Sequence, residues 1–161
     1  METVKKQKVL IALDYDLTAK KVAEKGYLMA QSMGAEVMLL HVIADSTYYS
    51  SLEYSPIVGF LGVTDFDSSN LIDSGGLKKL TMHFLDNMKH HLKDDTIRTL
   101  IKEGDFAEAI LETAKEIHAD IIVMGTHSRK WLENIVMGSV TEKVLNHTAI
   151  PLFIIPTRKP H

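Results

Sequence analysis

Short runs of consecutive apolar residues constrain the fold of this chain more than any other feature of its sequence. Segments 8–14, 37–42 and 120–125 each contain such a run. Runs of this kind are typical of strands buried on both faces, as in a parallel sheet covered by helices. Segments 96–101 and 152–155 complete five predicted strands, and the prolines that flank the last one favour an edge position for it.

Amphipathic segments lie between these predicted strands. Apolar residues recur at every third or fourth position over 19–33, 77–92 and 107–117, and a last helix is expected over 138–146. Thr18 and Gly34 are suitable residues to begin and end the first helix. The order β-α-β-loop-α-β-α-β-α-β predicts an α/β fold with an open, doubly wound, five-stranded parallel sheet and helices on both faces.

Length and composition indicate one domain over residues 1–161. A chain of 161 residues, 45% hydrophobic and 24% charged, can bury a complete core. The net charge of -3 gives no general attraction to nucleic acid or to anionic lipid, so neither is expected as a partner. With no cysteine, no signal peptide and no long apolar run, the chain is expected in the cytoplasm.

A long segment over residues 44–75 has no helical or strand period. It carries seven serines and three glycines, with tyrosines and phenylalanines scattered among them. Loops of this length in a compact domain are usually functional or disordered. The aromatic residues favour a partly packed lid or interface element.

Candidate ligand-binding residues follow the predicted strands. In open α/β sheets, ligands bind beyond the carboxyl ends of the strands, where the winding reverses. Asp14, Val42 and Gly125 lie at or just beyond such ends. After Gly125 a helix begins near Gly138 and Ser139, and a helix start offers N–H groups and a positive dipole end to a phosphate.

The same residues resemble the universal stress protein family. In that family a glycine, two spacers, a second glycine, nine spacers and Gly-Ser or Gly-Thr bind the nucleotide phosphates. This chain has Gly125, Ser128, Gly138 and Ser139 at that spacing. The resemblance implies an adenine nucleotide α-hydrolase-like fold with strand order 3-2-1-4-5 and points to the ATP-binding branch. It covers nearly the whole chain, through residues 8–14, 39–42, 104–110, 138–142 and 149–152.

The resemblance also implies which residues bind the nucleotide. Asp14 would contact the ribose or adenine, Ala12 would belong to the same site, and Val42 and Met124 would line the base pocket. The expected ligand is ATP, with ADP or AMP as alternatives and Mg²⁺ as a companion ion. The residues around the phosphates would be Gly125, Ser128, Gly138, Ser139 and Val140.

Ser128 departs from the family pattern, because ATP-binding members have glycine at this position. Serine is strained where φ is positive, although its hydroxyl could bond a phosphate oxygen. The adjoining His127, Arg129 and Lys130 either attract the anion or are exposed loop residues.

Each candidate residue also has a purely structural interpretation. Asp14 could cap the turn after its strand, and Gly138 with Ser139 could be an ordinary helix start. Val42 and Met124 could simply be core residues. A solvated helix face, rather than a metal site, is expected for His83, His90 and His91.

Three functional hypotheses follow. The first is a homodimeric stress-response protein that binds ATP and pairs through strand 152–155, whose free backbone groups invite a second chain. The second is a slow ATPase, for which the sequence offers no base, no Gly-x-Ser-x-Gly elbow and no Walker A ending. The third is a nucleotide-free signalling dimer, which Ser128 favours and Gly138 with Ser139 opposes.

Overall fold

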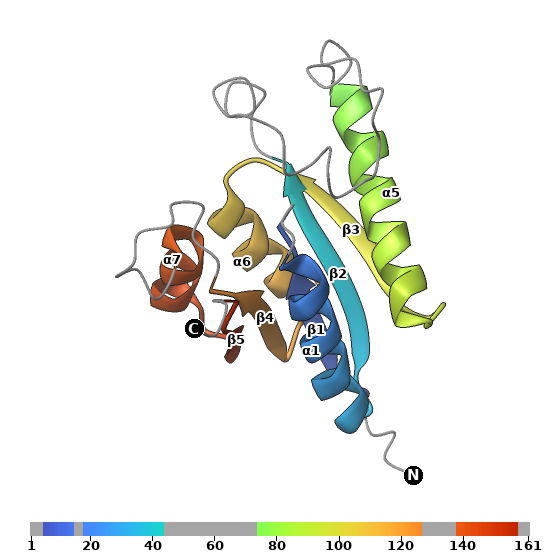
Figure 1. Cartoon of the computed structure of the whole chain (residues 1–161). Helices are drawn as coiled ribbons and strands as arrows, with labels where there is room; N and C mark the ends of the chain where they lie inside the picture. The colour runs from blue at the N-terminus through green and yellow to red at the C-terminus, as the bar shows by residue number, and fades with distance from the viewer. Residues whose placement is uncertain (1–4, 15–17, 44–73, 127–137, 158–161) are drawn as a thin grey trace, which may run out of the picture.

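A computed structural model describes residues 5–14, 18–43, 74–126 and 138–157 (Figure 1). In these ranges five parallel strands form one sheet in the order β3-β2-β1-β4-β5. The predicted fold class and strand order are therefore confirmed. The strands are β1 (Lys8–Ala12), β2 (Glu36–Ile43), β3 (Arg98–Glu103), β4 (Ile121–Gly125) and β5 (Leu152–Ile155).

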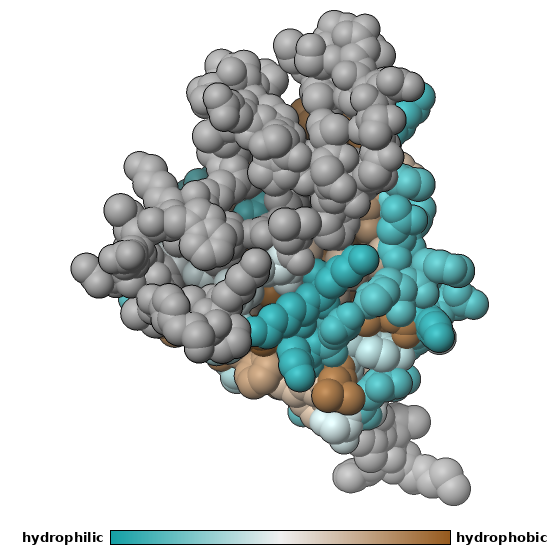
Figure 2. Space-filling view, in the orientation of Figure 1, coloured by the Kyte–Doolittle hydropathy of each residue, from teal (hydrophilic) through white to brown (hydrophobic). Residues whose placement is uncertain are grey.

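In the described part of the chain, helices cover both faces of the sheet (Figure 1). The helices α1 (Ala19–Ser32) and α5 (Ser74–Leu92) pack on one face, and α6 (Phe106–Glu116) and α7 (Ser139–His147) lie on the other. Hydrophilic residues predominate on the outer surface of α1 and α5 (Figure 2). Because the first two helices and the last two lie on opposite faces, the winding reverses between β1 and β4.

The sheet separates two apolar cores, and β1 contributes to both. Val9 and Ile11 pack under α1 and α5, whereas Leu10 packs under α6 and α7. All three side chains are fully buried. This burial on both faces explains why β1 is a continuous apolar run rather than an alternating one.

Gly26 allows α1 to lie unusually close to the middle of the sheet. A Cβ atom at this position would be 2.9 Å from Ile11 Cδ1 and 3.0 Å from Val123 Cγ1. Glycine inside a helix costs about 1 kcal/mol relative to alanine. The close packing of α1 on β1 and β4 offsets that cost.

Several predicted boundaries were wrong: β1 ends at Ala12 and not at Asp14, and β3 ends at Glu103 and not at Ile101. β3 begins at Arg98 instead of Thr96, because the N–H and hydroxyl of Thr96 both donate to Asp94 Oδ1, at 2.9 and 2.6 Å, and hold a turn there. α5 begins at Ser74, so the glycines expected to precede it lie in its first turn. The rest of the predicted loop, residues 44–73, lies outside the described residues.

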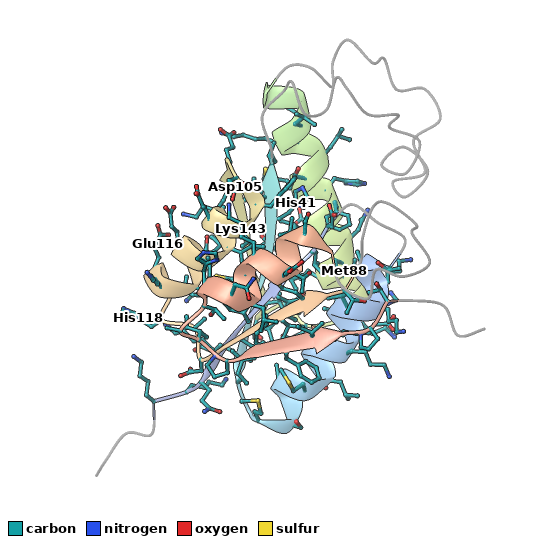
Figure 3. All side chains as sticks on the ribbon, turned by 90° about the vertical axis from the view of Figure 1, so that its left-hand side faces the viewer. His41, Met88, Asp105, Glu116, His118 and Lys143 are labelled. Carbon is teal, nitrogen blue, oxygen red and sulfur yellow. The ribbon has the colours of Figure 1, made fainter. Side chains whose placement is uncertain are left out.

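Asp105 fixes the start of α6 and links it to α7. Its carboxylate accepts a hydrogen bond from the N–H of Glu108, at 3.0 Å, and lies 3.2 Å from Lys143 Nζ (Figure 3). The hydrogen bond from Glu108 is the largest cause of a lowered pKa for Asp105, and Lys143 lowers it further. Asp105 therefore stabilises the fold most when it is ionised.

We expect Asp105→Ala to lower the free energy of unfolding by about 1 kcal/mol at pH 7, and Asp105→Asn to cost less, since an amide oxygen can still cap the helix. Because the pKa is lower in the folded state, the charge-dependent stabilisation is present above the unfolded pKa. It is lost as the pH falls through the folded pKa. Urea unfolding at pH 7 and pH 3 should show the difference between wild type and Asp105→Asn shrinking in acid. An equal difference at both pH values would contradict this account.

Candidate functional site

The carboxyl ends of β1, β2 and β4 meet at one edge of the sheet. Cα pairing places Ala12 beside Leu40 and Ile11 beside Val123. The strand ends that carry the predicted site residues are therefore neighbours. The β1–β4 pair at this edge is where the winding reverses, which is the usual ligand position in such sheets.

The apolar candidates belong to one packed cluster on the α6 and α7 side of the sheet. Val42 and Met124 are only 4% and 5% exposed, and Ala12 and Val140 pack against the same cluster and are partly exposed. For Val42 and Met124 the core interpretation fits this structure well. Of the four, Ala12 and Val140 offer more surface to a ligand.

A threonine hydroxyl and backbone groups connect the end of β4 with the start of α7. The Gly138 N–H donates to Thr126 O at 3.0 Å, and the Thr141 hydroxyl donates to Gly125 O at 2.9 Å. These two bonds tie the end of β4 to the start of α7. The two ends of the chain on either side of residues 127–137 are therefore held next to each other.

Thr126 also connects the end of β4 to β5 and to the residue Thr157 after it. Its N–H donates to Ile155 O at 3.0 Å, and its hydroxyl accepts the Thr157 N–H at 3.0 Å. The two threonine hydroxyls are 3.3 Å apart. Thr126, Thr141 and Thr157 were not identified as site residues from sequence. Thr126 follows Gly125 in the glycine pattern and Thr141 lies in segment 138–142, but the spacing of these threonines did not indicate their contacts.

The start of α7 leaves some of its backbone N–H groups without an acceptor inside the helix. Gly138 occupies the N-cap with an extended backbone (φ -70°), so a positive φ does not require glycine there. Its N–H is already bonded to Thr126 O. Glu142 is the first residue whose N–H bonds back to Gly138 O. Helix geometry therefore leaves the N–H groups of Ser139, Val140 and Thr141 without an acceptor inside α7.

Gly125 is explained by packing. A Cβ atom there would lie 2.8 Å from both Thr157 Cγ2 and Val22 Cγ2. The missing side chain lets α1 and the segment after β5 meet over the end of β4. The glycine that the family pattern assigns to phosphate binding thus has a structural role here in any case.

Asp14 lies two residues beyond β1 and is partly buried. Ser128, His127, Arg129 and Lys130 lie outside the described residues. His83, His90 and His91 are all exposed, as expected for the solvated face of a helix.

His91 Nε2 is 2.6 Å from Glu24 Oε1, which links α5 to α1. Within the described ranges, no group of three His, Asp or Glu side chains is placed to hold a metal ion. In the same part of the chain, no helix combines the length and apolar character needed to cross a membrane.

Fold and site together define a doubly wound α/β protein whose candidate site lies at the switch point of its sheet. The model of the universal stress protein family matches residues 6–156. The chain therefore belongs to the universal stress protein family.

Individual relatives agree with this assignment. Universal stress protein MJ0577 of Methanocaldococcus jannaschii is 28% identical over 154 residues, which are 92% of this chain and 94% of that protein. The solved structure of MJ0577 has a TM-score of 0.71 at 26% identity and covers 98% of this chain and 100% of its own.

Two more distant structures share the fold and were solved as nucleotide complexes. A universal stress protein in complex with cAMP has a TM-score of 0.61 at 17% identity, and covers 96% of this chain and 100% of its own. The universal stress protein of Archaeoglobus fulgidus in complex with dAMP has a TM-score of 0.58 at 16% identity, with 92% and 97% covered.

We expect Gly125→Ala to lower the free energy of unfolding by about 1–3 kcal/mol, since its Cβ would overlap two buried methyl groups. Thr157→Ser removes one of these methyls and keeps the hydroxyl near Thr126. The cost of Gly125→Ala should therefore be smaller in a Thr157→Ser background. Chemical denaturation of the four proteins in this cycle measures the difference. Equal costs in both backgrounds would mean that Thr157 does not select glycine here.

Proposed function

We propose that this protein binds an adenine nucleotide, ATP in the first place, at the carboxyl edge of its sheet, and acts as a stress-response or signalling module in the cytoplasm. The start of α7 carries the proposal. The N–H groups of Ser139, Val140 and Thr141 have no acceptor inside the helix, and they lie beside the switch point of the sheet. A helix start of this kind favours a phosphate.

The anchoring of that helix start supports the same proposal. Thr141 and Thr126 hold α7 against the end of β4, so its N–H groups would meet a phosphate without rearranging the fold. The relatives solved with cAMP and dAMP carry ligands that share an adenine base and a phosphate. Ala12 ends the neighbouring strand β1 and Asp14 follows it, and both would face the nucleoside part. Mg²⁺ would arrive with the phosphates, as it commonly does in nucleotide sites.

A nucleotide-free signalling dimer is the second candidate, and three observations favour it. Packing explains Gly125, Thr126 already uses the Gly138 N–H, and Val42 and Met124 are buried in the core. A slow ATPase would need a positioned base in addition to the nucleotide.

Calorimetric titration of the protein with ATP, ADP and AMP, with and without Mg²⁺, tests nucleotide binding. We expect saturable ATP binding that Gly138→Arg abolishes, since a bulky side chain at the helix start would occupy the phosphate position. Because Gly138 is buried, Ser139→Asp serves as a second variant. An acid in the first turn stabilises a helix but repels phosphate, so binding should weaken by roughly tenfold or more while the fold is kept.

Asn146→Asp and Asn146→Arg are the matched controls, since Asn146 is exposed in the last turn of the same helix. They should leave the affinity for ATP unchanged. Absence of saturable binding in the wild type would overturn the nucleotide proposal and favour the nucleotide-free dimer.

We further propose that the protein forms a homodimer through β5. The strand is at the edge of the sheet, and Phe153 is 41% exposed. Pro151 O accepts a hydrogen bond from Ile122 of β4, and Ile155 O accepts one from Thr126, the residue after β4, so the backbone of every second residue faces β4. The backbone groups of Leu152 and Ile154 therefore point to the free edge, where a second chain could pair.

Light scattering after gel filtration tests whether β5 forms the dimer interface. Ile154→Pro removes an N–H from the free edge without removing a β4–β5 bond, so it should shift a dimer to a monomer that remains folded. Ile154→Val keeps the N–H and should remain dimeric. A dimer in both variants would place the interface elsewhere, and a monomeric wild type would remove the proposal.

A further inference from the structure

We propose that His41 is a positioning residue for the nucleotide site: its imidazole fixes the Leu13 carbonyl and thereby the backbone that presents Asp14. This inference rests on the proposed nucleotide binding and on the predicted contact of Asp14 with the nucleoside.

The His41 ring is buried beneath α5 near the carboxyl edge of the sheet (Figure 3). It is 2% exposed and packs edge-on against Phe84, with ring centroids 6.0 Å apart and an interplanar angle of 69°. Its Nδ1 atom lies 2.8 Å from Leu13 O. A carbonyl oxygen can only accept, so Nδ1 carries the proton in this contact.

This contact holds the chain where it leaves the sheet. The pairing of β1 with β2 runs as far as Ala12 beside Leu40, and the Leu13 N–H then donates to Leu40 O at 2.9 Å. The next group along the backbone is the Leu13 carbonyl, which His41 holds. Both polar backbone groups of the residue before Asp14 are therefore fixed by β2.

His41 also links two strand ends that the candidate site uses. It directly precedes Val42, and its hydrogen-bond partner directly precedes Asp14. A rotation of the Leu13–Asp14 peptide would break this bond in a buried place, which costs about 1–3 kcal/mol. The carboxylate of Asp14 is therefore presented to the edge of the sheet from a restricted backbone.

Packing alone would favour an apolar residue at position 41. The neighbours on this side of the sheet are Leu13, Leu39, Phe84 and Leu85, all buried and apolar. Burying an imidazole among them is costly unless it makes a hydrogen bond. The contact with Leu13 provides that bond, and it is directed at the residue that directly precedes Asp14.

Two substitutions separate the hydrogen bond from the packing. His41→Leu fills the buried space with an apolar side chain and removes the hydrogen-bond donor. His41→Asn can place an amide N–H₂ where Nδ1 lies. We expect His41→Leu to weaken ATP binding by about tenfold and His41→Asn to remain within about threefold of the wild type. Titration calorimetry gives the affinities, and urea unfolding gives the stability of each variant.

Thr113→Val is the control for a general loss of stability. Thr113 is buried in α6, and its hydroxyl donates to Ala109 O at 2.7 Å, away from β1. This variant should lower stability and leave the affinity for ATP unchanged. Equal affinity losses in Thr113→Val and His41→Leu would overturn the inference, because affinity would then follow stability alone.

A double-mutant cycle with Asp14→Asn tests whether His41 acts through Asp14. We expect His41→Leu to cost little additional affinity when Asp14 is already replaced, since coupled residues give non-additive losses. Additive losses, or an unchanged affinity in His41→Leu, would overturn the role of His41 alone. A wild type that binds no nucleotide would instead overturn the proposed function, and this inference with it.

Discussion

The burial of β1 between two apolar cores is the constraint on which the rest of the structure depends. β1 pairs with β2 on one side and β4 on the other, and its side chains enter both cores. Each fully buried Leu or Ile contributes roughly 1.5–3 kcal/mol. Because the winding reverses beside β1, the same burial fixes the place where the strand ends open to a ligand. The burial of β1 thus determines both the stability of the fold and the position of the candidate site.

The sequence was sufficient for most of the fold, because local patterns determine most of it. Continuous apolar runs mark β1, β2 and β4, and the recurrence of apolar residues marks the helices. The start of β3 was missed because Thr96 bonds to Asp94 and forms a turn in a segment that has strand-like composition. The start of α5 was missed because glycines read as a break are tolerated in a first helical turn.

The candidate site could be predicted less completely. Spacing and family resemblance identified Asp14, Gly138 and Ser139, which the structure places at the switch-point edge. They did not reveal that Thr126 occupies the Gly138 N–H, or that His41 holds the residue before Asp14. These bonds join residues that are far apart in sequence, and such pairs leave no local pattern. Only the fold brings them together.

The pair formed by Thr126 and Thr157 has a consequence for the register of β5. Side chains alternate between the two faces of a strand, so a slip of one residue would exchange buried Ile155 with its outward neighbour. An edge strand of four residues has few bonds with which to resist such a slip. The Thr157 N–H meets the Thr126 hydroxyl in only one register. Thr157, which lies beyond the strand, thus favours one register of β5 against β4.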